Sequence, residues 1–171
     1  MGMYTEFVFA VELNSKTIER DGVINILKYM VRDAKRIHPD KLPNHPFFKT
    51  ERWWMLFTMG SAYFPGITHS DFQCSHGDYF LTVRSNLKNY DSEIELFLDW
   101  ITPYVVNAHG KCFGYFRYEE DDNPSLIYID HYDEVSPVKI MRVHPRIVCC
   151  TLEPLATFLP DTWHEWMREK E

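Results

Sequence analysis

The sequence predicts an α+β domain whose sheet is mainly antiparallel. Short runs with alternating apolar and polar residues occur before, between and after two longer runs of helical spacing. Turn signals rich in Gly, Pro, Asn and Asp separate most of the expected strands, which is typical of hairpins. Only two helical connections are expected, so a doubly wound parallel sheet is disfavoured.

The first half of the chain predicts a strand, a helix, a loop and a second strand. Residues 4–13 alternate but carry apolar residues at both parities, so we expect a strand buried on much of both faces. Asn14 offers a cap for the helix that follows, which should end before Pro39. Residues 37–50 contain three prolines and predict a long surface loop, and the apolar run 53–59 predicts a strand.

The second half predicts further strands around one more helix. Residues 67–74 indicate a short strand, and residues 79–87 give the clearest alternation in the chain. Ser92 and Glu95 have the spacing of a capping box, followed by an amphipathic helix. The remaining expected strands are a hairpin, 111–118 with 125–131, and a strand at 138–143.

The resulting order, β-α-β-(β)-β-α-β-β, resembles a ferredoxin-like, split β-α-β arrangement with two helices on one face of the sheet. An extra hairpin and a C-terminal extension over residues 145–171 would be added to it. No repeat, low-complexity tract or linker divides the chain, so we expect residues 1–171 to form a single domain. The other sheet face could be covered by the extension or by a second subunit of a homodimer.

Charge and composition bear on the class of partner. The formal net charge is −7, and the sequence has 12 Phe, 10 Tyr and 5 Trp. An acidic chain without a basic cluster repels phosphate, so direct nucleic-acid binding is disfavoured. Acidic charge instead favours a protein partner with a basic surface, and aromatic residues serve cores and interfaces equally well.

The cysteines and the apolar runs predict a cytoplasmic protein. Four cysteines are present without a C-x-x-C pair, which favours reduced, mostly buried thiols. The start of the chain lacks the pattern of a signal peptide, and no apolar run approaches the length of a membrane helix.

Histidine and aspartate recur at a spacing of two residues. Four of the eight histidines are followed by such an aspartate, and two of these pairs lie close together, His69 with Asp71 and His76 with Asp78. Imidazole and carboxylate are ligands of zinc, iron or manganese, so these four residues are candidate ligands of a divalent metal. Ordinary turn chemistry explains the same residues, and this alternative stays open.

Two further segments are candidate partner-binding sites. The expected hairpin carries an acidic turn, and the C-terminal extension carries two tryptophans of the kind enriched at binding hot spots. The candidate residues are Glu119, Glu120, Asp121, Asp122, Trp163 and Trp166. A solvated turn and a helix packed on the sheet are the simpler explanations.

The sequence lacks a phosphate-binding loop, a dinucleotide fingerprint and a hydrolase nucleophile elbow. The leading hypothesis is therefore a non-enzymatic protein-binding module that inhibits a partner with a basic surface, of the immunity or anti-defence type. The alternative is a metal-dependent hydrolase or nuclease-like enzyme that uses the His-Asp cluster to activate water. A small-molecule-binding domain is a third possibility, which rests on analogy of fold alone.

Overall fold

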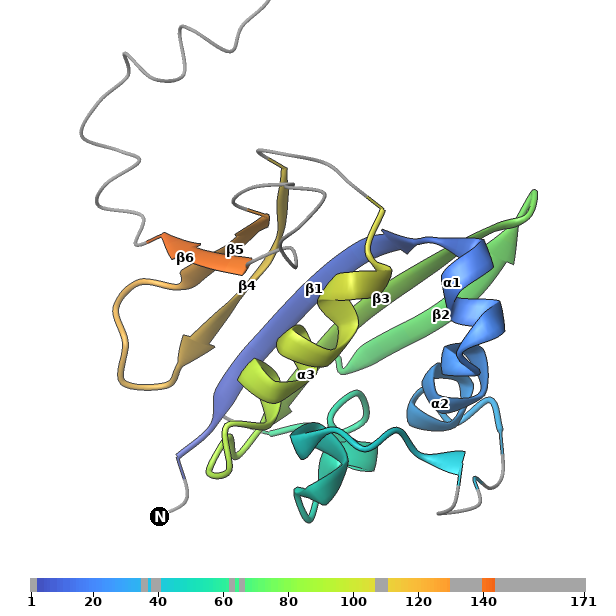
Figure 1. Cartoon of the computed structure of the whole chain (residues 1–171). Coiled ribbons are helices and arrows are strands. Elements are labelled where there is room, and N and C mark those ends of the chain that lie inside the picture. The colour runs from blue at the N-terminus through green and yellow to red at the C-terminus, as the bar shows by residue number, and fades with distance from the viewer. Residues whose placement is uncertain are drawn as a thin grey trace, which may run out of the picture.

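The described strands form one antiparallel sheet. The computed structural model describes residues 3–34, 37, 41–61, 64, 67–106, 111–129 and 140–143. The sheet has six strands in the order β2-β3-β1-β4-β5-β6, and every pairing is antiparallel (Figure 1). The strands are β1 Thr5–Leu13, β2 His69–Ser75, β3 Asp78–Leu87, β4 Cys112–Tyr118, β5 Ser125–Ile129 and β6 Ile140–Val143. The mainly antiparallel α+β class is therefore confirmed.

β1 lies inside the sheet and, over its second half, has one buried and one open face. Phe7 and Phe9 are fully buried, and the same face continues through Val11. Ala10 and Glu12, on the other face, are exposed. The expectation of a strand buried on much of both faces was therefore wrong for the second half of β1.

The helical segment after β1 is divided into two short helices, α1 Ser15–Arg20 and α2 Val23–Met30. Asn14 caps α1 through its side chain, which accepts a hydrogen bond from the backbone N–H of Thr17 at 3.3 Å. Gly22 separates the helices with a φ of 71°, a conformation in which a residue with a Cβ is strained.

Residues 41–61 pack against the core through two 3₁₀ helices, η2 Pro46–Lys49 and η3 Trp53–Met55. Phe47 in η2 is fully buried, so the expectation of a long surface loop was wrong at this position. The strand predicted over residues 53–59 is also wrong. A short apolar run cannot be assigned to strand or helix by its periodicity alone, and packing decided here.

The next helix, α3 Glu93–Ile101, lies over β1 in Figure 1 and continues into the 3₁₀ helix η4 Thr102–Tyr104. The expected capping box is absent: Ser92 has a φ of 55° and makes no side-chain cap. The side chain of Asn89 instead accepts a hydrogen bond from the N–H of Ile94 at 3.0 Å. A residue outside the predicted motif therefore caps this helix.

An aromatic cluster holds the helices against β1. Phe97 of α3 lies at its centre, with ring centroids 6.0 Å from Phe7, 5.9 Å from Phe9, 5.1 Å from Phe57 and 5.6 Å from Phe47. Buried residues of α1, α2 and α3 belong to the same hydrophobic core. Of the two roles open to aromatic residues, core and interface, much of the aromatic content of the described residues thus serves the core.

Candidate functional site

The four candidate metal ligands lie along the β2–β3 hairpin. His69 begins β2, and Asp71 lies two residues later, on the same face of the strand. A hydrogen bond from the Gln73 amide to the Asp71 carboxylate shows that alternate residues of β2 share a face. His76 and its neighbour Gly77 form the two-residue turn, both with positive φ, and the turn predicted there is confirmed.

The extended strand separates the two His-Asp pairs. Six residue steps of about 3.3 Å place His69 about 20 Å from Ser75, the residue before His76. The structure therefore does not bring the two histidines together. Among the described residues, no group of three His, Cys, Asp or Glu side chains is arranged to hold a metal ion. Metal binding by this hairpin stays a prediction, which elemental mass spectrometry of the protein and of a variant lacking both histidines checks.

His45, in the segment predicted as a loop, has a local structural role. Its Nδ1 accepts a hydrogen bond from the backbone N–H of Phe47 at 3.2 Å, and its Nε2 lies 3.2 Å from a carboxylate oxygen of Asp99. It caps η2 and ties it to α3. The remaining His-Asp pairs, at residues 38–40 and 131–133, fall outside the described residues, as do Trp163 and Trp166.

The acidic turn connects β4 to β5, as predicted from the sequence. The N–H of Asp121 donates to the carbonyl of Tyr118 at 2.9 Å, which closes the turn. Glu120, Asp121 and Asp122 are exposed, whereas Glu119 is half-buried. Burial raises the pKa of Tyr118, and the negative charges of Glu120, Glu119 and Asp121 raise it further. The turn is thus a local source of negative potential.

A hollow of about 260 Å³ lies beside the acidic turn. Two of its lining residues are unusually exposed for their type, Tyr90 at 59% and Met3 at 42%. The ammonium of Lys88 lies 5.9 Å from the ring centroid of Tyr90, within cation–π range. The full lining is Met3, Thr5, Asn89, Tyr90, Glu95, Phe116 and Tyr118. Carboxylates therefore occur beside the exposed side chains of Tyr90 and Met3 at this end of β4.

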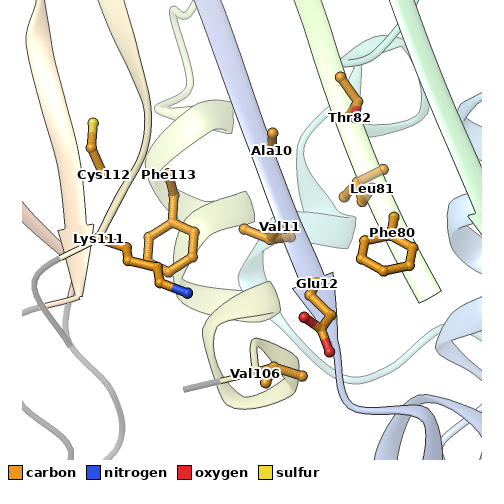
Figure 2. A pocket seen from close by; sticks show the side chains of 10 residues that line it. All are labelled: Ala10, Val11, Glu12, Phe80, Leu81, Thr82, Val106, Lys111, Cys112 and Phe113. Carbon is orange, nitrogen blue, oxygen red and sulfur yellow. The ribbon is translucent and has the colours of Figure 1, made fainter. Parts of the chain in front are cut away.

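A larger groove, of about 350 Å³, lies on the open face of the sheet (Figure 2). Its lining combines an apolar floor with Glu12 and Lys111. Phe80, in its wall, is 41% exposed. The lining residues are Ala10, Val11, Glu12, Phe80, Leu81, Thr82, Val106, Lys111, Cys112 and Phe113. Sequence reasoning missed this groove, and the only local signal was the small residue Ala10 in an otherwise bulky strand.

A buried carboxylate occupies the same sheet face near the start of β1. Glu6 is 6% exposed, and its two carboxylate oxygens lie 3.7 Å from guanidinium nitrogens of Arg84 and Arg117. Burial raises the pKa of Tyr115, and the charge of Glu6 raises it further. The three charged residues lie on β3, β1 and β4. The buried carboxylate of Glu6 requires positive charge beside it, so its two arginine partners stabilise the pairing of their strands with β1.

Comparisons with protein-family models, curated proteins and solved structures found no match to this chain. In the described part of the chain, no helix combines the length and the apolar content needed to span a bilayer.

Proposed function

We propose that this chain is a cytoplasmic protein-binding module that uses its acidic turn to bind a basic surface on another protein. The proposal includes inhibition of that partner without catalysis, in the manner of an immunity or anti-defence protein. The observation that carries it is the exposure of Glu120, Asp121 and Asp122 at the tip of the β4–β5 hairpin, next to the hollow lined by Tyr90 and Tyr118.

The combination of charge and aromatic surface supports an interface better than charge alone. Protein interfaces are enriched in tyrosine and methionine at their centre and are polar at their rim. Tyr90 and Met3 supply exposed apolar surface, and the acidic turn supplies negative potential beside it. A negative rim steers a basic partner toward the apolar centre and thereby raises the association rate.

The test neutralises the turn without changing its shape. After affinity capture and identification of a partner, its association rate is measured by stopped flow at several salt concentrations. The variant is Glu120→Gln, Asp121→Asn, Asp122→Asn. We expect association to slow by about tenfold at low salt and to become less dependent on salt.

A second triple variant controls for net charge. Asp33→Asn, Glu51→Gln, Asp78→Asn removes three exposed carboxylates away from the β4–β5 hairpin and changes the net charge equally. If the turn is the binding site, this variant associates at close to the unaltered rate. Equal slowing in both variants would mean that net charge, and not the acidic turn, guides association.

We also infer that the described part follows a ferredoxin-like, split β-α-β arrangement. The order β2-β3-β1-β4 supports this, with helices connecting β1 to β2 and β3 to β4. Residues of α2 and α3 belong to one core with β1, which supports two helices on one face. A crystal structure with another strand order would contradict this inference.

A further inference from the structure

The groove on the open sheet face is created by the backbone of β4. β4 pairs with β1 from Thr5 to Phe9, and the pairing stops there. On its other side, the register of β4 with β5 shifts between Cys112 and Gly114. Beyond Phe9, the neighbour of β1 on this side is the segment after η4: the N–H of Val106 donates to the carbonyl of Glu12 at 2.9 Å. A change of neighbour along one strand leaves a gap that no single side chain fills.

The floor of the gap is small and its walls are aromatic. Ala10 is exposed on the open face of β1, with Thr82 opposite it on β3. Phe80 and Phe113 stand on either side, as Figure 2 shows. The volume of about 350 Å³ falls in the range of small-molecule sites, about 300 to 1,000 Å³. The groove can therefore accommodate an apolar group of modest size.

Opposite charges lie at one end of the groove. In Figure 2 the ammonium of Lys111 and the carboxylate of Glu12 lie on either side of Val11, whereas Ala10 and Thr82 lie at the other end. The described residues show no ion pair between Lys111 and Glu12, and both residues are exposed. Glu12 can therefore bind the ammonium group of a ligand, and Lys111 can bind its carboxylate.

We propose that this groove binds a small zwitterion, a free α-amino acid with an apolar side chain. The ligand ammonium pairs with Glu12 and the ligand carboxylate with Lys111. Its side chain then lies over Ala10 between Phe80 and Phe113. This site is separate from the acidic turn, which lies at the other end of β4, so the two proposals can fail independently.

The test is an NMR titration of the ¹⁵N-labelled full chain with L-leucine and L-phenylalanine. We expect saturable shifts of the amides of Ala10, Phe80, Thr82 and Phe113. The dissociation constant should be on the order of 1 mM, as is usual for a ligand of this size. N-acetyl-leucine amide, which lacks both charges, should give no saturable shift at the same concentrations.

Two single variants identify the charged partners. Glu12→Gln and Lys111→Met, both at exposed positions, should each weaken L-leucine binding by about tenfold and leave the remaining amide spectrum unchanged. Glu120→Gln, at the far end of β4, is the matched control and should bind as the unaltered chain does. Absence of saturable shifts, equal shifts with the uncharged analogue, or binding unaffected by Glu12→Gln would each overturn the proposal.

Discussion

A buried carboxylate at the start of α3 provides the sharpest test of the core. The side chain of Glu93 is 1% exposed, and one of its oxygens lies 2.7 Å from a guanidinium nitrogen of Arg52. Its other oxygen accepts the N–H of Asp91 at 3.0 Å. Replacing Arg52 by Met keeps an apolar stem and removes the positive charge, so the Glu93 carboxylate stays buried with one hydrogen bond.

The expected loss follows from the burial of the pair. Breaking a buried ion pair from one side typically costs about 3 to 5 kcal/mol. The side chain of Arg52 is 23% exposed, so water can reach part of the site. We therefore expect Arg52→Met to lower the free energy of unfolding by about 3 kcal/mol, the lower end of that range. Adding Glu93→Gln should restore about 2 kcal/mol, because a neutral amide costs less to bury.

The assay is urea denaturation followed by circular dichroism at neutral pH. Arg20→Met is the control, since Arg20 also pairs with a carboxylate at 2.7 Å but its side chain is 72% exposed. We expect no measurable loss in that variant. If Arg52→Met costs less than about 1 kcal/mol, or if the double variant is no more stable than Arg52→Met, then Glu93 is not a buried charge held by Arg52.

Three further outcomes are expected. Phe47→Ala should lower the free energy of unfolding by about 4 kcal/mol in urea denaturation, because Phe47 is fully buried; a loss below about 1 kcal/mol would refute this. Gly114→Ala should lower the melting temperature more than Gly77→Ala does, because its Cβ would lie 1.9 Å from the carbonyl oxygen of Val8, whereas nothing lies within 4 Å at Gly77. Burial raises the pKa of Tyr115, so the contribution of its protonated side chain to the free energy of unfolding is complete below about pH 10 and is lost as pH rises above that value. Tyr115→Phe should therefore flatten the alkaline fall in the free energy of unfolding, and an unchanged slope would contradict this.

The parts of the fold predicted from the sequence are those set by local periodicity. Residues 79–87 alternate cleanly, and β3 spans Asp78–Leu87 with Leu81 and Val83 fully buried. The β4–β5 hairpin could also be predicted from the sequence, because a polar turn separates two runs with the pattern of strands. In β3 the buried Leu81 and Val83 alternate with exposed Phe80, Thr82 and Arg84, which is the condition under which alternation is informative.

The errors occur where tertiary packing overrides local pattern. Residues 53–59 are apolar except for Thr58, and Leu56 and Phe57 enter the aromatic core directly after the 3₁₀ helix η3. Phe47 enters the same core from a proline-rich segment that locally has every feature of a loop. The composition left open whether the aromatic residues serve a core or an interface, and the residues that build the core come from segments far apart in the sequence.

Neither candidate surface could be located from the sequence with its full set of residues. The acidic turn was visible as a charge run, but Tyr90 and Met3 join it only because β1, β4 and the segment before α3 meet there. The groove lies where the pairing of β1 with β4 ends at Phe9, and the small residue Ala10 next to it is the only local signal of that end. The candidate metal ligands show the opposite relation. His69 and His76 are close in the sequence, but the extended strand β2 between them keeps them far apart in the structure.

β4 connects the two proposed surfaces, and its geometry makes them separable by experiment. Gly114 lies against the carbonyl of Val8 near the groove end, where a Cβ would displace the strand. The acidic turn at the other end is held by the hydrogen bond from Asp121 to Tyr118 and by that from Glu119 to Tyr4. Displacement near Gly114 should therefore alter the groove and leave the turn intact. A Gly114→Ala chain that stays folded should lose the amino acid and retain the basic partner.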